Sequence, residues 1–285
     1  MLCYDLHSHS TASDGELTPA ELVQRACAQG VDVLALTDHD VLDGLSEAML
    51  ASQPLGLILI PGVEISVSWQ GRLVHIVGLG VNAANQRLQQ GLMELRAKRL
   101  VRATEIGRRL EALGIAGAAE GARQKSQGQV ISRSHFARFL VEQGFARDFK
   151  AAFKRYLGQG KAAFVPCEWA GLDEAVAWIQ GAGGQAVIAH PARYAMSRRL
   201  LCAFLEEFKA LGGDGIEVVS SSHSHQEIMA MSAYAQQFGL LASAGSDFHS
   251  PASTWAELGR IPALPEDCAP IWTNWQLAAR TYAFS

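Results

Sequence analysis

Short apolar runs alternate with longer amphipathic stretches along most of the chain. Seven of these runs have the length of a β-strand and are rich in Val, Ile, Leu and Ala. Strand-length runs that alternate with helical patterns are typical of βαβ units and a parallel sheet. The strands are expected at residues 3–7, 33–36, 57–60, 74–79, 186–189, 216–219 and 240–244.

Helices are expected between most of these strands. Thr18 has the character of an N-cap and Pro19 fits the first turn, so a helix should run from there to about Gln29 and stop at Gly30. A long, Arg-rich helical pattern follows the fourth strand. Its range and those of three further expected helices are 85–113, 172–180, 198–211 and 225–238.

The stretch between residues 114 and 167 interrupts the alternation. It begins with Gly/Ala/Ser-rich sequence, and one helix should open at Ser134-His135 and run through Val141, with another at 149–157. The stretch is also basic. We therefore predict that residues 1–113 and 168–285 form the main domain, and that 114–167 is a small helical insertion that contributes to substrate binding.

Composition narrows the class of protein. A chain of 285 residues, 49% hydrophobic and 18% charged, can bury a sizeable core as one α/β domain with an insertion. A formal charge of −4 gives no overall basic field, so long DNA is not an expected partner, whereas a small anionic substrate is compatible with it.

The cysteines and the N-terminus bear on location. The five cysteines are odd in number and lack the close spacing of thiolate zinc sites, so reduced thiols in a cytoplasmic protein are expected. The residues before Asp5 and His7 lack the basic segment and longer apolar stretch of a signal peptide, so none is expected. The longest strongly apolar run, 55–60, is shorter than the roughly 20 residues that cross a bilayer. No membrane association is expected.

Histidines and carboxylates gather at the ends of the apolar runs. In His7-Ser8-His9 the two imidazoles point to the same side of an extended strand and can share one metal ion. Alone, a His-x-His pair is more often an accident of a surface or a core. A lone His75 inside its apolar run would likewise be a hydrogen-bonded core residue.

Together these residues favour a different interpretation. His39 and Glu64 follow the second and third strands, His190 ends another, and Asp247 and His249 follow the last. Active residues of barrel and open-sheet enzymes lie at such strand ends. The pattern predicts a multinuclear metal centre, and the alternative is a set of scattered caps and core polar groups.

These motifs resemble the PHP family, named for polymerase and histidinol phosphatase. The resemblance implies a distorted (β/α)7 barrel of the PHP type, in the α/β class, with three divalent metal ions at the C-terminal ends of the strands. Manganese is the first expectation, with iron or zinc open. The matching motifs are His7-Ser8-His9, Ser13-Asp14-Gly15, Leu36-Thr37-Asp38-His39, Pro61-Gly62-Val63-Glu64, His75, Ala189-His190-Pro191 and Gly245-Ser246-Asp247-Phe248-His249.

The resemblance also implies how the ligands are shared. One metal would be held by His7, His9, Glu64 and Asp247, a second by Glu64, His75 and His190, and a third by Asp14, His39 and His249. Asp38 is then spare, and it is a candidate for a partner of a metal ligand or a proton acceptor.

The closest likeness is to the branch of the family that carries an inserted helical segment. Members of that branch are 3′,5′-nucleotide bisphosphate phosphatases, and some also trim short RNA from the 5′ end. A phosphoric ester hydrolase of this kind would act through a metal-bridging hydroxide that attacks phosphorus in line. His223, which follows the strand 216–219, is a candidate to contact phosphate or to protonate the leaving group.

Phosphate recognition needs further cations or N–H groups. Arg133-Ser134-His135 stands at a predicted helix N-terminus, where an anion is favoured, although a plain Ser N-cap with solvated neighbours fits equally well. Lys161 lies in a glycine-flanked turn, which is a weak signal. Arg193 must lie near the metals if His190 is a ligand.

Three other functions remain open from the sequence. A histidinol-phosphate phosphatase would use the same metals on another alcohol. A non-catalytic PHP module would serve as a scaffold, although a retired site has no physical need for so many buried charged groups. Hydrolysis of C–N bonds is a third possibility that substrate assays would separate.

Overall fold

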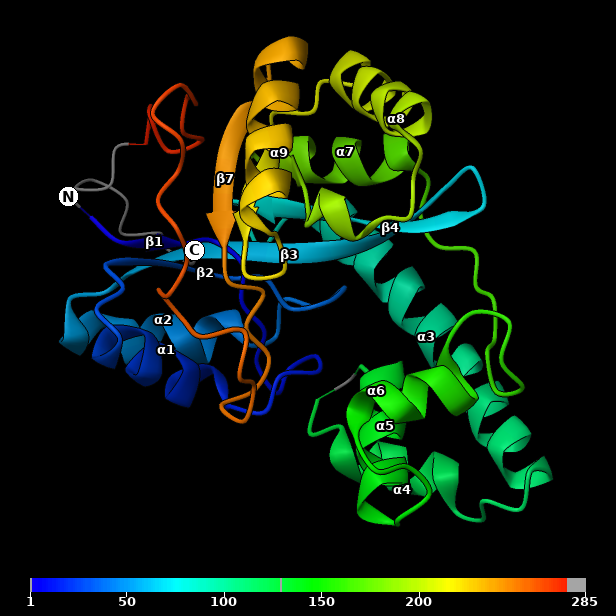
Figure 1. The fold of residues 1–285 in the computed structure, drawn as a ribbon. Coiled ribbons are helices and arrows are strands. Elements are labelled where there is room, and N and C mark those ends of the chain that lie inside the picture. Colours follow the sequence, from blue (N-terminus) through cyan, green and yellow to red (C-terminus); the bar gives the residue numbers. More distant parts are fainter. Residues whose placement is uncertain (1, 129, 276–285) are drawn as a thin grey trace.

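A seven-stranded sheet curls into a nearly closed barrel in the computed structural model of the protein, which describes residues 2–128 and 130–275 (Figure 1). The first and last strands meet where Leu6 N–H donates to the Ala244 carbonyl at 2.9 Å. The barrel predicted from the sequence is confirmed. Its strands neighbour one another in chain order: β1 (Tyr4–Asp5), β2 (Val33–Leu36), β3 (Ile58–Trp69), β4 (Arg72–Leu79), β5 (Gln185–Ile188), β6 (Gly215–Ser220) and β7 (Leu241–Gly245).

One strand runs against the others. β3 and β4 form an antiparallel hairpin, and β4 is antiparallel to β5 as well, so a fully parallel sheet was a wrong expectation. The two-residue turn of Gln70 and Gly71 has positive φ at both positions, which is the turn geometry that joins such strands tightly. Because β4 is reversed, its first residues lie at the end of the barrel where the other strands finish.

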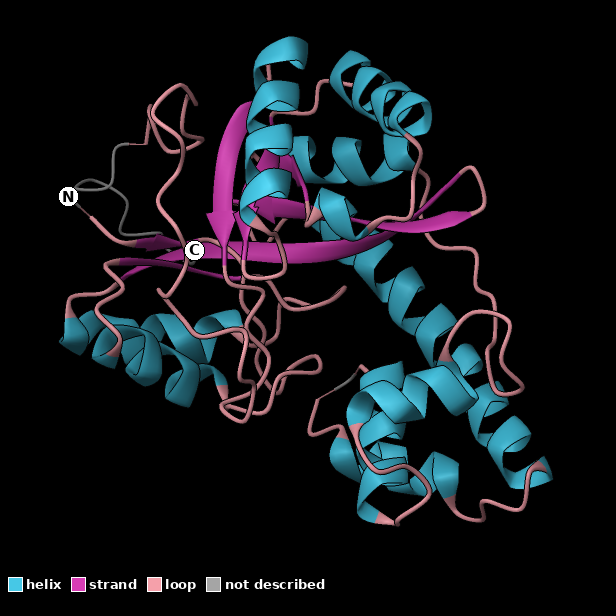
Figure 2. Ribbon diagram, in the orientation of Figure 1, coloured by secondary structure: helices cyan, strands magenta, loops and turns pink. Residues whose placement is uncertain are grey.

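Helices pack on more than one side of the barrel (Figure 2). α1 (Pro19–Ala28) begins with a capping box formed by Thr18 and Glu21, and it packs with α2 (Leu45–Ser52). α7 (Leu172–Gly181), α8 (Arg198–Ala210) and α9 (His225–Phe238) lie on the other side (Figure 1). The periodicity predicted all of these except α2, which begins at Gly44 without a side-chain cap and so leaves no start signal.

A second group of helices is carried at the far end of α3 (Gln86–Ala112), which leads away from the barrel (Figure 1). It contains α4 (Ala118–Lys125), α5 (Arg133–Glu142) and α6 (Phe149–Ala152), whose last turn continues as a π-helical segment, Phe153–Leu157. The sequence predicted α5 and α6 but not α4. This group is called the insertion below.

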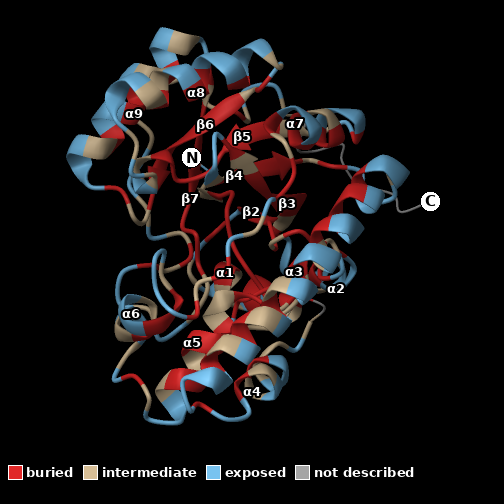
Figure 3. Cartoon of the chain, turned by 90° about the vertical axis from the view of Figure 1, so that its right-hand side faces the viewer, coloured by how far each residue is buried: buried red, intermediate tan, exposed pale blue. Residues whose placement is uncertain are grey.

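The insertion has its own hydrophobic core, separate from the buried strands of the barrel (Figure 3). The last turns of α3 contribute Ile106 and Leu110 to that core, which also contains Phe136 and Leu140. Because α3 contributes to this core before residue 114, the start of the insertion at residue 114 stays a prediction. None of the helices described in residues 2–128 and 130–275 combines the length and hydrophobicity needed to cross a membrane.

Candidate metal centre

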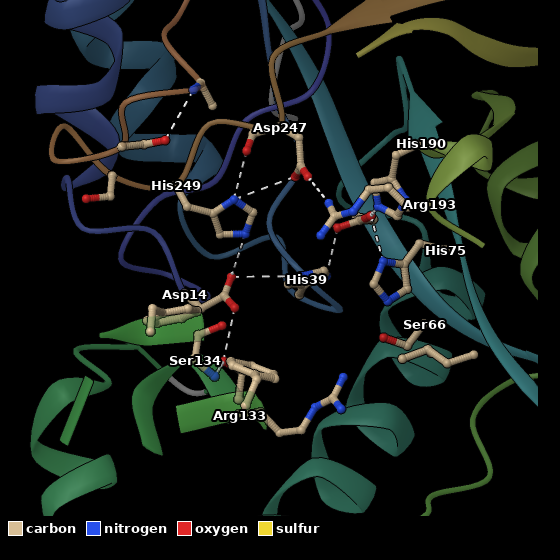
Figure 4. Close-up of a pocket in the computed structure, with 18 of the residues that line it drawn as sticks. Asp14, His39, Ser66, His75, Arg133, Ser134, His190, Arg193, Asp247 and His249 are labelled. Carbon is tan, nitrogen blue, oxygen red and sulfur yellow. Dashed lines mark hydrogen bonds and ion pairs between the residues drawn. The ribbon is translucent and has the colours of Figure 1, made fainter. Parts of the chain in front are cut away.

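Ligand-type side chains from distant parts of the chain converge at one end of the barrel (Figure 4). Nε2 of His7 and Nε2 of His9 are 3.1 Å apart. Oε2 of Glu64 lies 3.4 Å from the first and 3.3 Å from the second, and Oδ1 of Asp247 lies 3.6 and 3.3 Å from them. These four residues are the set that the resemblance implies for one metal.

Glu64 occupies the middle of the site. Its Oε1 is 2.9 Å from His75 Nδ1 and 3.0 Å from His190 Nε2, while its Oε2 is 2.8 Å from His39 Nδ1. Glu64 lies within β3 rather than after it, because that strand is much longer than predicted. His75 is within reach because β4 is reversed.

A third group of ligand atoms lies around Asp14. Oδ1 of Asp14 is 3.3 Å from His249 Nε2 and 3.8 Å from His39 Nε2, and a nitrogen of His9 also falls in this group. The predicted ligands are thus brought together, in overlapping groups: His9 belongs to two of them and His39 to two.

The backbone is adapted to this convergence. His190 has φ 29° and Asp247 has φ 54°, which is the left-handed region that costs a side-chain-bearing residue free energy, as is frequent at functional sites. Close approaches are also built in. A Cβ on Gly245 would lie 2.3 Å from His7 Cβ, and one on Gly15 would lie 2.2 Å from the carbonyl oxygen of His9. Only glycine fits at these two positions.

Burial and neighbouring charge set the protonation of the cluster. Burial, reinforced by the charge of His249, lowers the pKa of His9 to about 3, and burial lowers that of His75 to about 4. Burial opposes ionisation of Glu64, but the surrounding histidines outweigh it and hold its pKa well below the usual range. Burial also opposes protonation of His7, His39 and His249, but the neighbouring carboxylates outweigh it and raise their pKa values, that of His249 to about 9. These three imidazoles must lose a proton when a metal binds, because only a neutral imidazole is a ligand.

Buried nitrogen and oxygen atoms that make no hydrogen bond indicate whether the site suits a metal. Each buried polar atom without a hydrogen bond costs about 1–3 kcal/mol, so proteins rarely leave several together. A donor set of nitrogen and oxygen without thiolate is also what manganese, iron and zinc accept. The site therefore fits divalent cations. Its buried atoms that lack a hydrogen-bond partner are His9 Nδ1, Asp14 Oδ1, His39 Nδ1, Glu64 Oε2, His75 Nδ1 and His190 Nδ1.

Glu217, in β6, is a residue of this site that the sequence did not reveal. Its Oε1 lies 2.5 Å from His7 Nδ1, and its Oε2 accepts a hydrogen bond from the backbone N–H of His190 at 2.6 Å. A proton on Nδ1 leaves Nε2 of His7 free to face the cluster. A buried carboxylate that orients a histidine in this way is a common partner of metal ligands. A glutamate in an otherwise apolar strand was the only signal available.

Glu217→Gln is expected to weaken the binding of divalent metal by about ten- to a hundredfold, because the amide holds the Nδ1–H of His7 less strongly. Metal affinity can be measured by competition with a coloured chelator. Glu206→Gln is the matched control, since Glu206 is an exposed residue of α8. Equal metal affinity in Glu217→Gln and the control would contradict this role.

Asp38 and His223, the two predicted catalytic residues, are both buried and do not line the cavity over the cluster. Asp38 is buried and accepts hydrogen bonds from Ser10 N–H at 2.8 Å, Ser10 Oγ at 2.6 Å and Ser13 Oγ at 2.5 Å, so it supports the turn that carries Asp14. Burial raises its pKa to about 6. His223 is buried with Nδ1 3.1 Å from the Val218 carbonyl, and it is not among the residues that line the cavity described next.

A cavity of about 620 Å³ lies over the cluster, between the barrel and the insertion. Of the predicted substrate-binding residues, Arg133, Ser134 and Arg193 line it. Arg193 Nη1 lies 2.5 Å from Asp247 Oδ2, at the edge of the metal cluster (Figure 4). The other three do not line it: His223 is buried as described above, Lys161 is exposed elsewhere, and His135 is buried with Nδ1 accepting from Ser132 N–H.

Helix α3 and the insertion bring positive charge to the cavity that holds the metal cluster. Arg102 and Arg133 both line the cavity, and within the described chain neither has a carboxylate within 4 Å. Burial, together with the charge of Arg133, lowers the pKa of Arg102 to about 10. The sequence analysis missed Arg102 on α3 because an Arg-rich helical pattern is typical of a solvent-exposed helix.

The insertion also contacts one of the proposed metal ligands, Asp14, directly. Ser132 caps α5, accepting from Ser134 N–H, and its hydroxyl donates to Asp14 Oδ2 at 3.0 Å. Arg138 donates to the Asp14 carbonyl at 2.5 Å. Placement of Asp14 is thus coupled to the insertion, which the spacing of residues along the chain could not indicate.

Comparison with known proteins gives the same family as the motifs. The model of the PHP domain matches residues 5–159. The chain is 49% identical over 269 residues to a 3′,5′-nucleoside bisphosphate phosphatase of Chromobacterium violaceum, covering 94% of both proteins. It is 47% identical over 269 residues to a 5′-3′ exoribonuclease of Haemophilus influenzae, covering 94% of this chain and 97% of that one. A solved structure from Chromobacterium violaceum, described as an amidohydrolase with bound sulfate and no metal, superposes with a TM-score of 0.93 at 47% identity, over 97% of this chain and 96% of the other.

Proposed function

Since this chain belongs to the PHP family of phosphoesterases, we propose that it removes the 3′-phosphate of nucleoside 3′,5′-bisphosphates, for example converting adenosine 3′,5′-bisphosphate to AMP and phosphate. The observation that carries the proposal is one cavity with two chemically different walls. One wall presents a cluster suited to divalent metals, and the other presents arginines without carboxylate partners. A substrate with two phosphates matches both walls.

The proposed enzyme holds three divalent metal ions, manganese first among them. His7, His9, Glu64 and Asp247 would hold one, with Glu64 shared by the second, as the short contacts of both its oxygens support. When bound, such cations neutralise phosphoryl oxygens and lower the pKa of water, which is the chemistry that hydrolysis of a phosphate ester needs. The remaining proposed ligands are His75 and His190 for the second ion, and Asp14, His39 and His249 for the third.

The arginines supply orientation. Arg193, beside Asp247, is positioned to hold an oxygen of the reacting phosphate next to the metal cluster. Arg133, with the hydroxyl of Ser134, would hold the 5′-phosphate at the start of α5, where the helix dipole also favours an anion. Asp38 acts through the Ser10–Ser13 turn by keeping Asp14 in place.

Trimming of short RNA from the 5′ end is a second candidate activity, because a relative that shares 47% of residues is called a 5′-3′ exoribonuclease. A cavity of about 620 Å³ is within the range of sites that take small organic ligands, so it can receive the terminal nucleotide of a short RNA. A cytoplasmic location is proposed on the basis of the cysteines, none of which is paired.

Phosphate release with several substrates tests the proposed function. The manganese-loaded protein is expected to release phosphate from adenosine 3′,5′-bisphosphate, leave AMP intact, and shorten a 5′-phosphorylated oligoribonucleotide by one nucleotide at a time. Turnover of histidinol phosphate without turnover of the bisphosphate would show that the protein is a histidinol-phosphate phosphatase instead. Hydrolysis of an amide, with no release of phosphate from any of these substrates, would show that the protein is a hydrolase of C–N bonds.

Arg133→Ala is expected to raise KM for adenosine 3′,5′-bisphosphate by about ten- to a hundredfold with a smaller change in kcat, because the residue would bind a phosphate that does not react. Steady-state kinetics measure both constants. Arg123→Ala is the control within the same insertion, since Arg123 is exposed and pairs with Glu120. A KM equal to that of the control would exclude Arg133 from the site.

A further inference from the structure

Two exposed aromatic side chains stand at the cavity. Among the large hydrophobic residues that are solvent-exposed in the described chain, Phe149 and Trp255 are the two aromatic ones, with 44% and 58% of their surface accessible. Both line the cavity that holds the metal cluster. The exposed aliphatic side chains lie elsewhere, so the planar apolar surfaces are the ones found at the functional cavity, where they can contact a ligand.

The two side chains come from different walls. Phe149 opens α6 in the insertion, whereas Trp255 lies in the loop after β7, on the barrel. The cavity lining also includes polar groups, such as Ser132, Ser250 and Ser253. The cavity therefore combines one aromatic side chain from the insertion and one from the barrel with the charged groups of the metal cluster.

Phe149 is supported from behind. Its ring centroid is 5.4 Å from that of Phe153, at an interplanar angle of 36°, and Phe153 is in turn covered by the guanidinium of Arg133 at 5.5 Å. Phe149, Phe153 and Arg133 thus form a contiguous series of side chains that leads from the proposed 5′-phosphate position to the exposed ring of Phe149.

We propose that Phe149, backed by Phe153, and Trp255 form stacking surfaces for the nucleobases of the substrate, an inference that rests on the proposed function and specifies how the organic part of the substrate is held. Stacking uses the π-face that every base possesses, so it binds nucleotides without selecting among bases. The described residues around the two rings offer no array of amide side chains that would read a base edge. The same surfaces serve a mononucleotide bisphosphate and the 5′ end of a short RNA.

Comparison of a nucleotide with its abasic analogue tests the stacking surfaces. The analogue of adenosine 3′,5′-bisphosphate in which hydrogen replaces the base keeps both phosphates. In Phe149→Ala and in Trp255→Ala, kcat/KM for the nucleotide relative to the analogue is expected to fall about tenfold. Trp255→Phe, which keeps a ring, should retain most of the wild-type ratio.

Controls separate stacking from folding and from the proposed function. Met229→Ala removes an equally exposed hydrophobic side chain on α9, outside the cavity, and should leave the ratio unchanged. Calorimetric binding of AMP to the metal-free protein gives a readout without turnover, and the same weakening is expected there. An unchanged ratio and unchanged AMP binding in either alanine variant would overturn the inference, whereas failure of the wild type to hydrolyse any bisphosphate would overturn the proposed function instead.

Discussion

Glu64→Gln is expected to lower kcat/KM for phosphate release by about a thousandfold or more, which corresponds to roughly 4 kcal/mol of lost transition-state stabilisation. Glu64 contacts five histidines with its two oxygens: His75 and His190 through Oε1, and His7, His9 and His39 through Oε2. A neutral amide has one oxygen and cannot connect two cation positions. Steady-state kinetics with manganese measure the loss.

Two further measurements make this result specific. Metal content by mass spectrometry should fall in Glu64→Gln, because the lost charge is shared between two groups of ligands. Glu206→Gln, at an exposed position of α8, should retain wild-type kinetics and metal content. If Glu64→Gln kept activity within about tenfold of this control, the central role of Glu64 would be wrong.

Removal and return of metal is expected to change stability as well as activity. A ligand that binds only the folded protein stabilises it by about 4 kcal/mol when its concentration is a thousandfold above Kd. For a domain of this size, that corresponds to a rise in Tm of about 8 °C for each such site. The reason is local: binding satisfies buried atoms such as His9 Nδ1 and Asp14 Oδ1 that otherwise lack a partner.

Thermal unfolding after chelator treatment, followed by addition of manganese, iron or zinc, measures this effect. The ion that raises Tm at the lowest concentration and also restores phosphate release would identify the functional metal. Glu64→Gln should show a smaller rise, since its ligand groups are incomplete. Absence of a Tm rise with all three ions would contradict a metal centre at this site.

Much of the fold could be predicted because it depends on local patterns. The seven strands and helices such as α1, α8 and α9 follow from the period of apolar residues and from caps such as Thr18. Most of the ligands could be found because their residue types and their places near strand ends suit a metal, whereas Glu64 and His75 lie within β3 and β4 and were indicated by their residue type and motif. Asp14, His39 and His249 lie on different loops, yet their chemistry identified them in advance of their contacts.

The sequence alone thus determined the barrel elements and the donor atoms, because both depend on residue type and on spacing over a few positions. The tertiary structure decided the pairing of reversed β4 with β5, the role of Glu217, the remote positions of His135 and Lys161, and the placement of Arg102 and Arg133 in one cavity with the ligands. Each of these depends on which segments pack together after the chain has folded. Contacts between separate segments, such as Glu217 with His7, have no periodicity along the chain and therefore leave no pattern to read.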